Sequence, residues 1–200
     1  SLKTWLMPAL SERLLARERL LRRRRKAEHR RVSRGLRHRV LYFHQVDDPY
    51  SALAAAILPR LIDRYDIEIV AHVVGPPSDH AAPEREKLIA YSRRDAQLLA
   101  RHWQLSFDDA GVQPQAADVE LATRLLVAAI EDGTFAETAG EIVASLWQEP
   151  SRLWAMVQPG GPLRAVEASV AASHVNASDA LRRKLGHYLG ATFFYAGEWY

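Results

Sequence analysis

The segment VLYFHQVDDPYS, residues 40–51, decides the fold of this chain. Its first five residues are β-branched, aromatic or apolar apart from His44, a composition typical of a buried strand. The residues DDPYS, 47–51, then predict a turn. Pro49 suits the first turn of a helix, where its missing N–H has no partner to lose. We therefore expect a strand over residues 40–44 and a helix over residues 51–65, kinked or shortened at Pro59.

The residues that follow predict an α/β sheet interrupted by a long helical block. Residues 67–74 alternate in the manner of a strand and end at Gly75 and two prolines. A strand, a helix and a second strand within about 35 residues form one unit of an α/β sheet. Further helices are expected over residues 83–103, 116–131, 134–147, 150–157 and 177–189. Residues 191–195 predict a strand, and Ala196 and Gly197 a hairpin turn into a return strand.

Composition excludes several classes of chemistry. The chain has 200 residues, a length suited to one domain with an appendage, and it contains no cysteine. Disulfides, thiolate metal sites and cysteine nucleophiles are therefore excluded. No apolar run reaches the roughly 18 residues of a membrane span. The first residues also lack the pattern of a signal peptide, so we expect a cytoplasmic protein.

Charge is divided unevenly along the chain. Residues 1–39 hold 14 Lys and Arg against 3 Glu, whereas the rest of the chain holds 13 against 21 Asp and Glu. We expect residues 1–39 to form a basic helical arm, capped at Ser11 and terminated at Gly35. Four of its leucines lie near one helical face, at positions 10, 14, 15 and 21. The arm is expected to dock on the acidic body, either its own or that of a second copy in a homo-oligomer. Nucleic-acid binding through Arg22–Lys26 ranks lower, because residues 8–41 contain no Phe, Tyr or Trp for stacking.

The two ends of the body resemble a known superfamily. Residues 40–43 leading into 48–51, together with LGATF, 189–193, and GEWY, 197–200, resemble the DsbA-like superfamily. It includes the DsbA oxidoreductases, the 2-hydroxychromene-2-carboxylate isomerases and the kappa-class glutathione transferases. The resemblance implies a thioredoxin-like sheet from residues 40–78 and 190–200, around an inserted helical part, residues 79–189.

Three functional elements of that superfamily are altered here. The Cys-x-x-Cys pair of the oxidoreductases falls on Asp48 and Ser51, and Asp48 also replaces the serine of the isomerases and kappa transferases. The cis-proline before a strand falls on Ala191, for which a trans bond is expected, since a non-proline cis bond costs about 2.5–4 kcal/mol. The terminal Trp-Gly-x-Asp-Arg segment of the family is not found within the 200 residues. The resemblance therefore implies a degenerate member.

The candidate site residues follow from this alignment. Asp48 and Ser51 take the catalytic positions, and the implied substrate-binding residues are His44, Asp47, Tyr50, Ala191 and Thr192. A carboxylate at position 48 would repel a bound thiolate. We also weighed an N-cap role for the two aspartates and a metal site in which His44 and His72 meet them. No metal is predicted, because no ligand motif with metal-binding spacing is present.

Two functions of different classes follow. The first is a non-redox binding module for a ligand or partner. The alternative is a glutathione-dependent isomerase or transferase of the 2-hydroxychromene-2-carboxylate isomerase type, with glutathione as its cofactor. In either case the small molecule would be a thiol or an aromatic acid in the cleft between sheet and helices. Disulfide oxidoreductase activity is excluded by the absence of cysteine.

Overall fold

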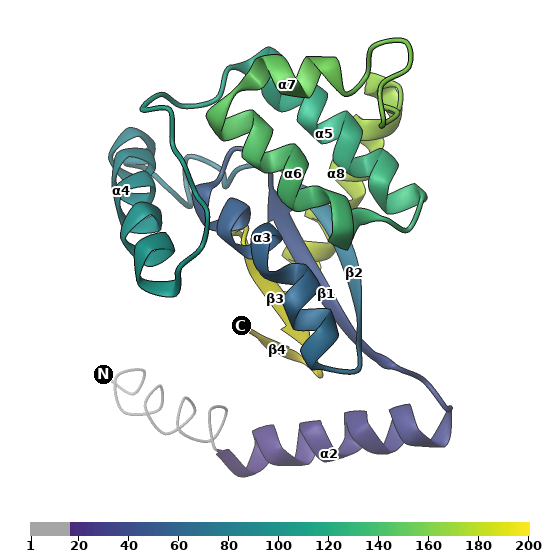
Figure 1. Ribbon diagram of the computed structural model, residues 1–200. Coiled ribbons are helices and arrows are strands. Elements are labelled where there is room, and N and C mark those ends of the chain that lie inside the picture. The colour runs from purple at the N-terminus through teal and green to yellow at the C-terminus, as the bar shows by residue number, and fades with distance from the viewer. Residues whose placement is uncertain (1–16) are drawn as a thin grey trace, which may run out of the picture.

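The computed structural model describes residues 17–200 as a mixed α/β protein (Figure 1). A four-stranded sheet is covered by helices, and one helix lies apart at the end of the sheet. In chain order the elements are α2 (Arg17–Ser33), β1 (His38–Gln45), α3 (Pro49–Arg64), β2 (Ile67–Val74), α4 (Arg85–Trp103), α5 (Ala116–Glu131), α6 (Phe135–Gln148), α7 (Pro150–Ala155), α8 (Ala168–Lys184), β3 (Thr192–Tyr195) and β4 (Glu198–Trp199).

The sheet has the order β2-β1-β3-β4. β1 pairs with β2 in parallel and with β3 antiparallel, and β3 pairs antiparallel with β4. The α3 helix connects the two parallel strands, as a parallel pair requires a crossover. The inserted block α4–α8 separates this βαβ unit from the β3–β4 hairpin. The expected order of a βαβ unit, a helical block and a terminal hairpin is confirmed.

Alternate residues of β1 face two different layers. On one face Tyr42 packs 4.7 Å from Phe193 and 6.2 Å from Phe135 of α6, measured between ring centroids. On the other face Phe43 stacks on His72 and lies 5.2 Å from Trp199. Both side chains are fully buried, so the run 40–44 forms the centre of the sheet, as its composition predicts.

The edge of β2 is closed by α8 rather than by another strand. The Nε2 atom of His174 accepts a hydrogen bond from the Val73 N–H, and Asp179 accepts one from the Gly75 N–H. Arg182 donates to the Gly75 carbonyl oxygen at 3.0 Å. Side chains of α8 thus satisfy backbone groups that the edge strand would otherwise leave open.

One expected helix start is wrong, and one of the two effects expected of Pro59 is absent. The last helix of the insertion begins at Ala168, nine residues before the expected start at position 177. Its first turns are rich in small and polar residues, and only Ala171 among them is buried. Pro59 does not shorten α3, which continues to Arg64.

The basic arm lies at one end of the sheet and contacts the body at few points (Figure 1). Within residues 17–33 it forms the expected helix, and Gly35 follows with a φ of 60° as a terminator. No residue of α2 is buried. Arg24 donates to both carboxylate oxygens of Glu198, at 3.0 and 2.6 Å. The expected cap at Ser11 and the leucines at 10, 14 and 15 lie outside the described residues.

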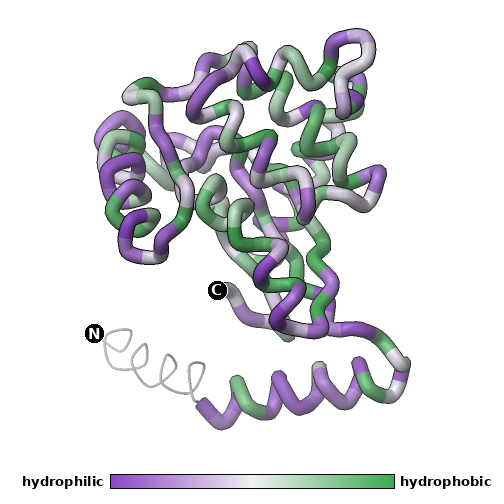
Figure 2. Tube along the Cα trace, viewed as in Figure 1, coloured by the Kyte–Doolittle hydropathy of each residue, from purple (hydrophilic) through white to green (hydrophobic). Residues whose placement is uncertain are grey.

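The described helices include none with the length and apolarity of a membrane span. The arm is the most continuously hydrophilic segment of the trace, whereas apolar residues are concentrated in the body (Figure 2).

Candidate functional site

A cavity of about 310 Å³ lies where β1 ends and α3 begins. Its walls come from the turn before α3, the loop after β2, the α4 helix and the segment before β3. Three of the predicted site residues, Asp47, Asp48 and Tyr50, line it directly. The other lining residues are Gln45, Pro49, Pro76, Pro77, Ala82, Arg85, Leu88, Ile89, Tyr91, Ser92, Gln113, Leu189 and Gly190. The walls are thus mainly prolines, aliphatic residues and tyrosines, with a few polar groups.

Asp48 is the N-cap of α3. Its Oδ2 atom accepts hydrogen bonds from the backbone N–H and the side-chain hydroxyl of Ser51, both at 2.8 Å. Burial raises the pKa of the Asp48 carboxyl above its usual range, while the bonds from Ser51 oppose this shift. The carboxylate therefore occupies the positive end of the helix.

Ser51 connects Asp48 to the strand. Its hydroxyl oxygen accepts a bond from the Gln45 N–H at 3.1 Å, and its carbonyl oxygen accepts one from the Tyr42 hydroxyl at 3.1 Å. Ser51 is completely buried. It therefore fixes the geometry of the turn and does not line the cavity.

His44 is completely buried next to this network, against Tyr42 and Phe135. The Tyr42 hydroxyl and His44 Nδ1 are 2.9 Å apart. Complete burial lowers the pKa of His44 to about 3, so the ring is neutral. Its Nε2 atom has no partner among the described residues, and the ring takes no part in lining the cavity.

The segment before β3 approaches the start of α3 very closely at Gly190. A Cβ atom at this position would lie 2.6 Å from the Gln45 Cβ and 3.2 Å from the Ser51 hydroxyl oxygen. Only glycine fits there. The next residue, Ala191, has a φ of 51°, and the described chain contains no cis peptide bond. The expected trans geometry at Ala191 is confirmed. Thr192 turns its hydroxyl back to the Leu189 carbonyl oxygen, so Ala191 and Thr192 lie beside the cavity but do not line it.

Asp47 and Tyr50 bind other side chains. The Asp47 carboxylate accepts a bond from the Gln45 side-chain amide at 2.9 Å, and its carbonyl oxygen accepts one from Gln113. The Tyr50 hydroxyl donates to Asp95 of α4 at 2.8 Å. Burial and the neighbouring Asp95 raise the pKa of the Tyr50 phenol. These bonds connect the turn to α4 and its following loop across the cavity.

The hypothesis that His44 and His72 meet in one metal site is wrong. In the register of the sheet, His72 is paired with Phe43, and His44 with Val73. Neighbouring positions of a strand point to opposite faces, so the two histidines lie on different sides of the sheet. The described residues also contain no group of three metal-ligating side chains.

Two polar residues of the cavity were missed from the sequence. Arg85, at the start of α4, donates to the Pro77 carbonyl oxygen at 2.6 Å and pairs with Asp79. Its Nε–H is buried without a hydrogen-bond partner in the described structure. Gln113, in the loop after α4, donates a hydrogen bond from its side-chain amide to the Asp47 carbonyl oxygen. Its Oε1 atom is buried and has no hydrogen-bond partner in the described structure. Both unpaired atoms are inaccessible to solvent, so Arg85 and Gln113 line the cavity through their other atoms. No local sequence signal identifies either residue.

The sheet order, the crossover helix and the helical insertion define the class of fold, which is the DsbA-like thioredoxin fold. A solved structure with this fold is that of a 2-hydroxychromene-2-carboxylate isomerase. It aligns with a TM-score of 0.57 and 13% identity over 81% of this chain and 87% of that chain. At this identity the likeness shows the fold. Neither a protein-family model nor a curated protein matches the chain.

Proposed function

We propose that this protein binds a small aromatic acid in the cavity at the start of α3 and carries out no redox chemistry. The observation that carries the proposal is the composition of the cavity wall, where Arg85 and Asp47 lie among prolines, aliphatic residues and tyrosines. A mainly apolar cavity with a few polar groups is typical of a small-molecule site.

The walls suggest the chemistry of this ligand. The guanidinium of Arg85 favours a carboxylate, to which it forms a strong charge-assisted bond. The carboxylate of Asp47, which also lines the cavity, accepts hydrogen bonds from a donor such as a hydroxyl group. Pro49, Pro76 and Leu189 offer apolar surface for a ring. An aromatic acid that also carries a hydroxyl group combines these three features, and its size suits a cavity of about 310 Å³.

Asp48 supports binding over thiol chemistry. A helix N-terminus lowers the free energy of an anion placed on it, and here the Ser51 donors are already used by the Asp48 carboxylate. An incoming thiolate would find neither a free donor nor a neutral neighbour at this position. The Asp48 carboxylate therefore already occupies the anion-binding position at the start of α3.

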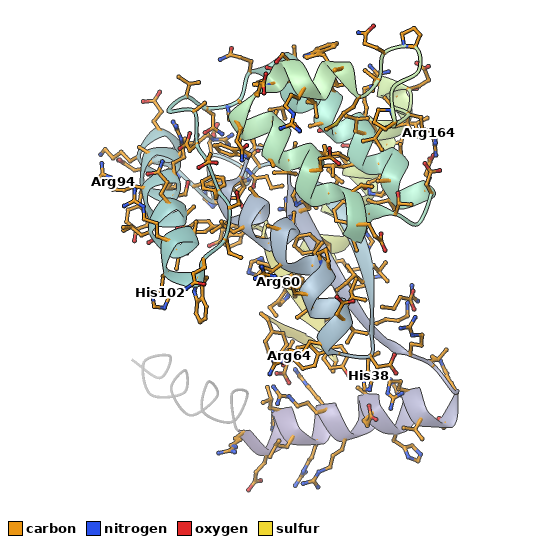
Figure 3. The ribbon with its side chains drawn as sticks, in the orientation of Figure 1. His38, Arg60, Arg64, Arg94, His102 and Arg164 are labelled. Carbon is orange, nitrogen blue, oxygen red and sulfur yellow. The ribbon has the colours of Figure 1, made fainter. Side chains whose placement is uncertain are left out.

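Isothermal titration with three related probes tests the proposal. Hydroxybenzoate should bind most tightly, benzoate more weakly because it lacks the donor, and benzamide weakest because it lacks the charge. Arg85→Gln should weaken hydroxybenzoate binding by about tenfold or more, the value of a charged hydrogen bond. Arg94→Gln is the matched control, because Arg94 lies exposed on the same helix and points outward (Figure 3). Failure of all three probes at millimolar concentration, or equal losses in the two variants, would contradict the proposal.

The second candidate is a glutathione-dependent isomerase or transferase, which the fold likeness to a 2-hydroxychromene-2-carboxylate isomerase favours. Glutathione titration distinguishes the two. Micromolar binding would support the second candidate, and no heat at millimolar glutathione would support the binding module.

A further inference from the structure

The arm carries far more positive charge than its surroundings neutralise. Residues 17–39 hold twelve Arg and Lys against two Glu. Among the described residues, Arg24 and Arg31 are the only cations of α2 that form ion pairs, with Glu198 and Glu28. A helix of this kind repels itself, because like charges one turn apart destabilise it. The uncompensated charge therefore indicates an anionic partner.

The cations surround the helix instead of forming a single stripe. Residues 22–25 are four consecutive arginines. Since successive helical residues are about 100° apart, these four alone span a full turn. Side chains extend from α2 both toward the body and away from it (Figure 3). A flat partner surface would neutralise only one side of such a helix.

On the side toward the body, the cations line a groove. A cavity of about 490 Å³ lies between α2 and the β3–β4 turn at Ala196 and Gly197. Five of its lining residues are cations, namely Arg23, Lys26, Arg30, Arg31 and Arg34, and no Asp or Glu is among the described residues that line it. The small residues of the turn leave the groove open opposite the arginines.

We propose that α2 and this groove bind the phosphate backbone of double-stranded nucleic acid without reading its sequence. A helix is about 10–12 Å across with its side chains, close to the width of the DNA major groove, about 12 Å. One phosphate strand would lie in the groove along Arg23, Arg30 and Arg34, and the cations on the far side of α2 would meet the other strand. Arginine is suited to this role because its planar fork binds phosphate oxygens in pairs.

Two other occupants fit the observations less well. An anionic membrane surface would favour a helix with an apolar face opposite its charged face, whereas the cations of α2 extend around the helix. The acidic body of a second copy would present charge to one side of α2 only. Both are therefore treated as outcomes of the test.

The test is fluorescence anisotropy with the full chain and two labelled 20-base-pair DNA duplexes of unrelated sequence. At about 50 mM salt both duplexes should bind alike, at micromolar concentration or below, and affinity should fall steeply as salt rises. A triple variant of the groove, Arg23→Gln, Arg30→Gln and Arg34→Gln, should lose at least tenfold in affinity. Its slope of log K against log salt should also be shallower by about 2–3.

The matched control removes three charges elsewhere. This second triple variant combines Arg94→Gln, Arg101→Gln and Arg183→Gln, at exposed positions of α4 and α8 outside the groove. It should change the affinity for DNA by less than about twofold. Circular dichroism should show both variants folded. Equal losses in the two triple variants would mean that bulk charge alone acts, which overturns the proposal. It is also overturned by the absence of duplex binding at low salt, by tighter binding to phosphatidylserine vesicles than to duplex, or by a concentration-dependent dimer that the groove variant abolishes.

Discussion

The start of α3 and the α2 helix both carry charged side chains, but these charges differ in how far the chain itself pairs them. At α3 a single carboxylate, Asp48, lies in place on the positive helix end and accepts two bonds from Ser51. At α2 nine cations share a helix with two glutamates, and none of its residues is buried. The first site is satisfied from within the chain and contributes to stability. The second is left open, so changes there should affect binding far more than folding.

The largest expected effect comes from acid, acting on the network behind the cavity. His44 is buried with its pKa lowered to about 3, whereas in the unfolded chain histidine titrates near 6.5. The unfolded state therefore binds more protons between these values, and the stability contributed by His44 is lost as pH falls from 6.5 toward 3. Between pH 6.5 and 4.5 the loss should be about 2–3 kcal/mol.

Urea unfolding at the two pH values measures this loss. In His44→Gln the loss between these pH values should be smaller by about 2 kcal/mol, and burial of His72 and His174, which also lowers their pKa values, accounts for a remaining slope. His29→Gln, at an exposed position of the arm, should behave as wild type. An unchanged slope in His44→Gln would show that other groups dominate the acid response.

The next effect concerns the close approach at Gly190. Gly190→Ala places a Cβ 2.6 Å from the Gln45 Cβ, and such overpacking should reduce the free energy of unfolding by about 1–3 kcal/mol. Gly140→Ala is a control of opposite sign, because Gly140 lies inside α6 and its added Cβ would make ordinary contacts at 3.7 Å. Replacing a helical glycine there should stabilise by up to about 1 kcal/mol. Chemical denaturation compares the two, and equal signs would contradict the tight packing at Gly190.

A smaller effect is expected on ligand affinity when the carboxylate at the start of α3 is removed. Asp48→Ser removes a negative charge from the helix N-terminus and should increase any affinity for glutathione, the ligand of the second candidate function, by about 1 kcal/mol at an effective dielectric constant near 20. Calorimetry detects this as a several-fold lower dissociation constant. Asp47→Ser should change affinity less, because the Asp47 carboxylate is turned to the Gln45 amide. Unchanged binding in Asp48→Ser would mean that residue 48 does not meet the thiol.

The smallest effect is expected at the contact between arm and body. Arg24→Gln breaks the bond to Glu198, but exposed ion pairs contribute little, so the melting temperature should change by less than about 3 °C. Differential scanning calorimetry measures this change, with Arg25→Gln as the neighbouring control. A larger fall would show that the arm supports the fold, and the contrast between the two sites would then weaken.

Local sequence signals predicted the bounds of an element correctly where residues that start or stop helices and strands flank it. The strand Ile67–Val74 and the helix Ala116–Glu131 have the predicted bounds, because alternation, glycine and proline identify them. The α8 helix begins earlier than predicted, since its first turns lack a periodic apolar pattern, and His174 in them contacts the Val73 N–H of β2. Tertiary contact, which no local pattern records, decided that boundary.

The candidate site was predicted in part for the same reason. The turn at residues 47–51 could be identified, because proline and aspartate have specific roles at a helix start. The opposite faces of His44 and His72 depend on the register of two strands, which the sequence does not specify. Arg85 and Gln113 reach the cavity from distant segments, so only the folded arrangement brings them to Asp47 and Asp48.

The separation of charge along the molecule has a practical consequence for its handling. Residues 104–152, around α5–α7, hold nine Asp and Glu against two Arg, and they lie at the opposite end of the molecule from α2 (Figure 1). A net charge of only +3 hides this large permanent dipole. Near neutral pH the protein presents a cationic pole and an anionic pole, each within reach of a charged support. It should therefore be retained on both cation- and anion-exchange resins at low ionic strength, with the stronger retention on the cation exchanger.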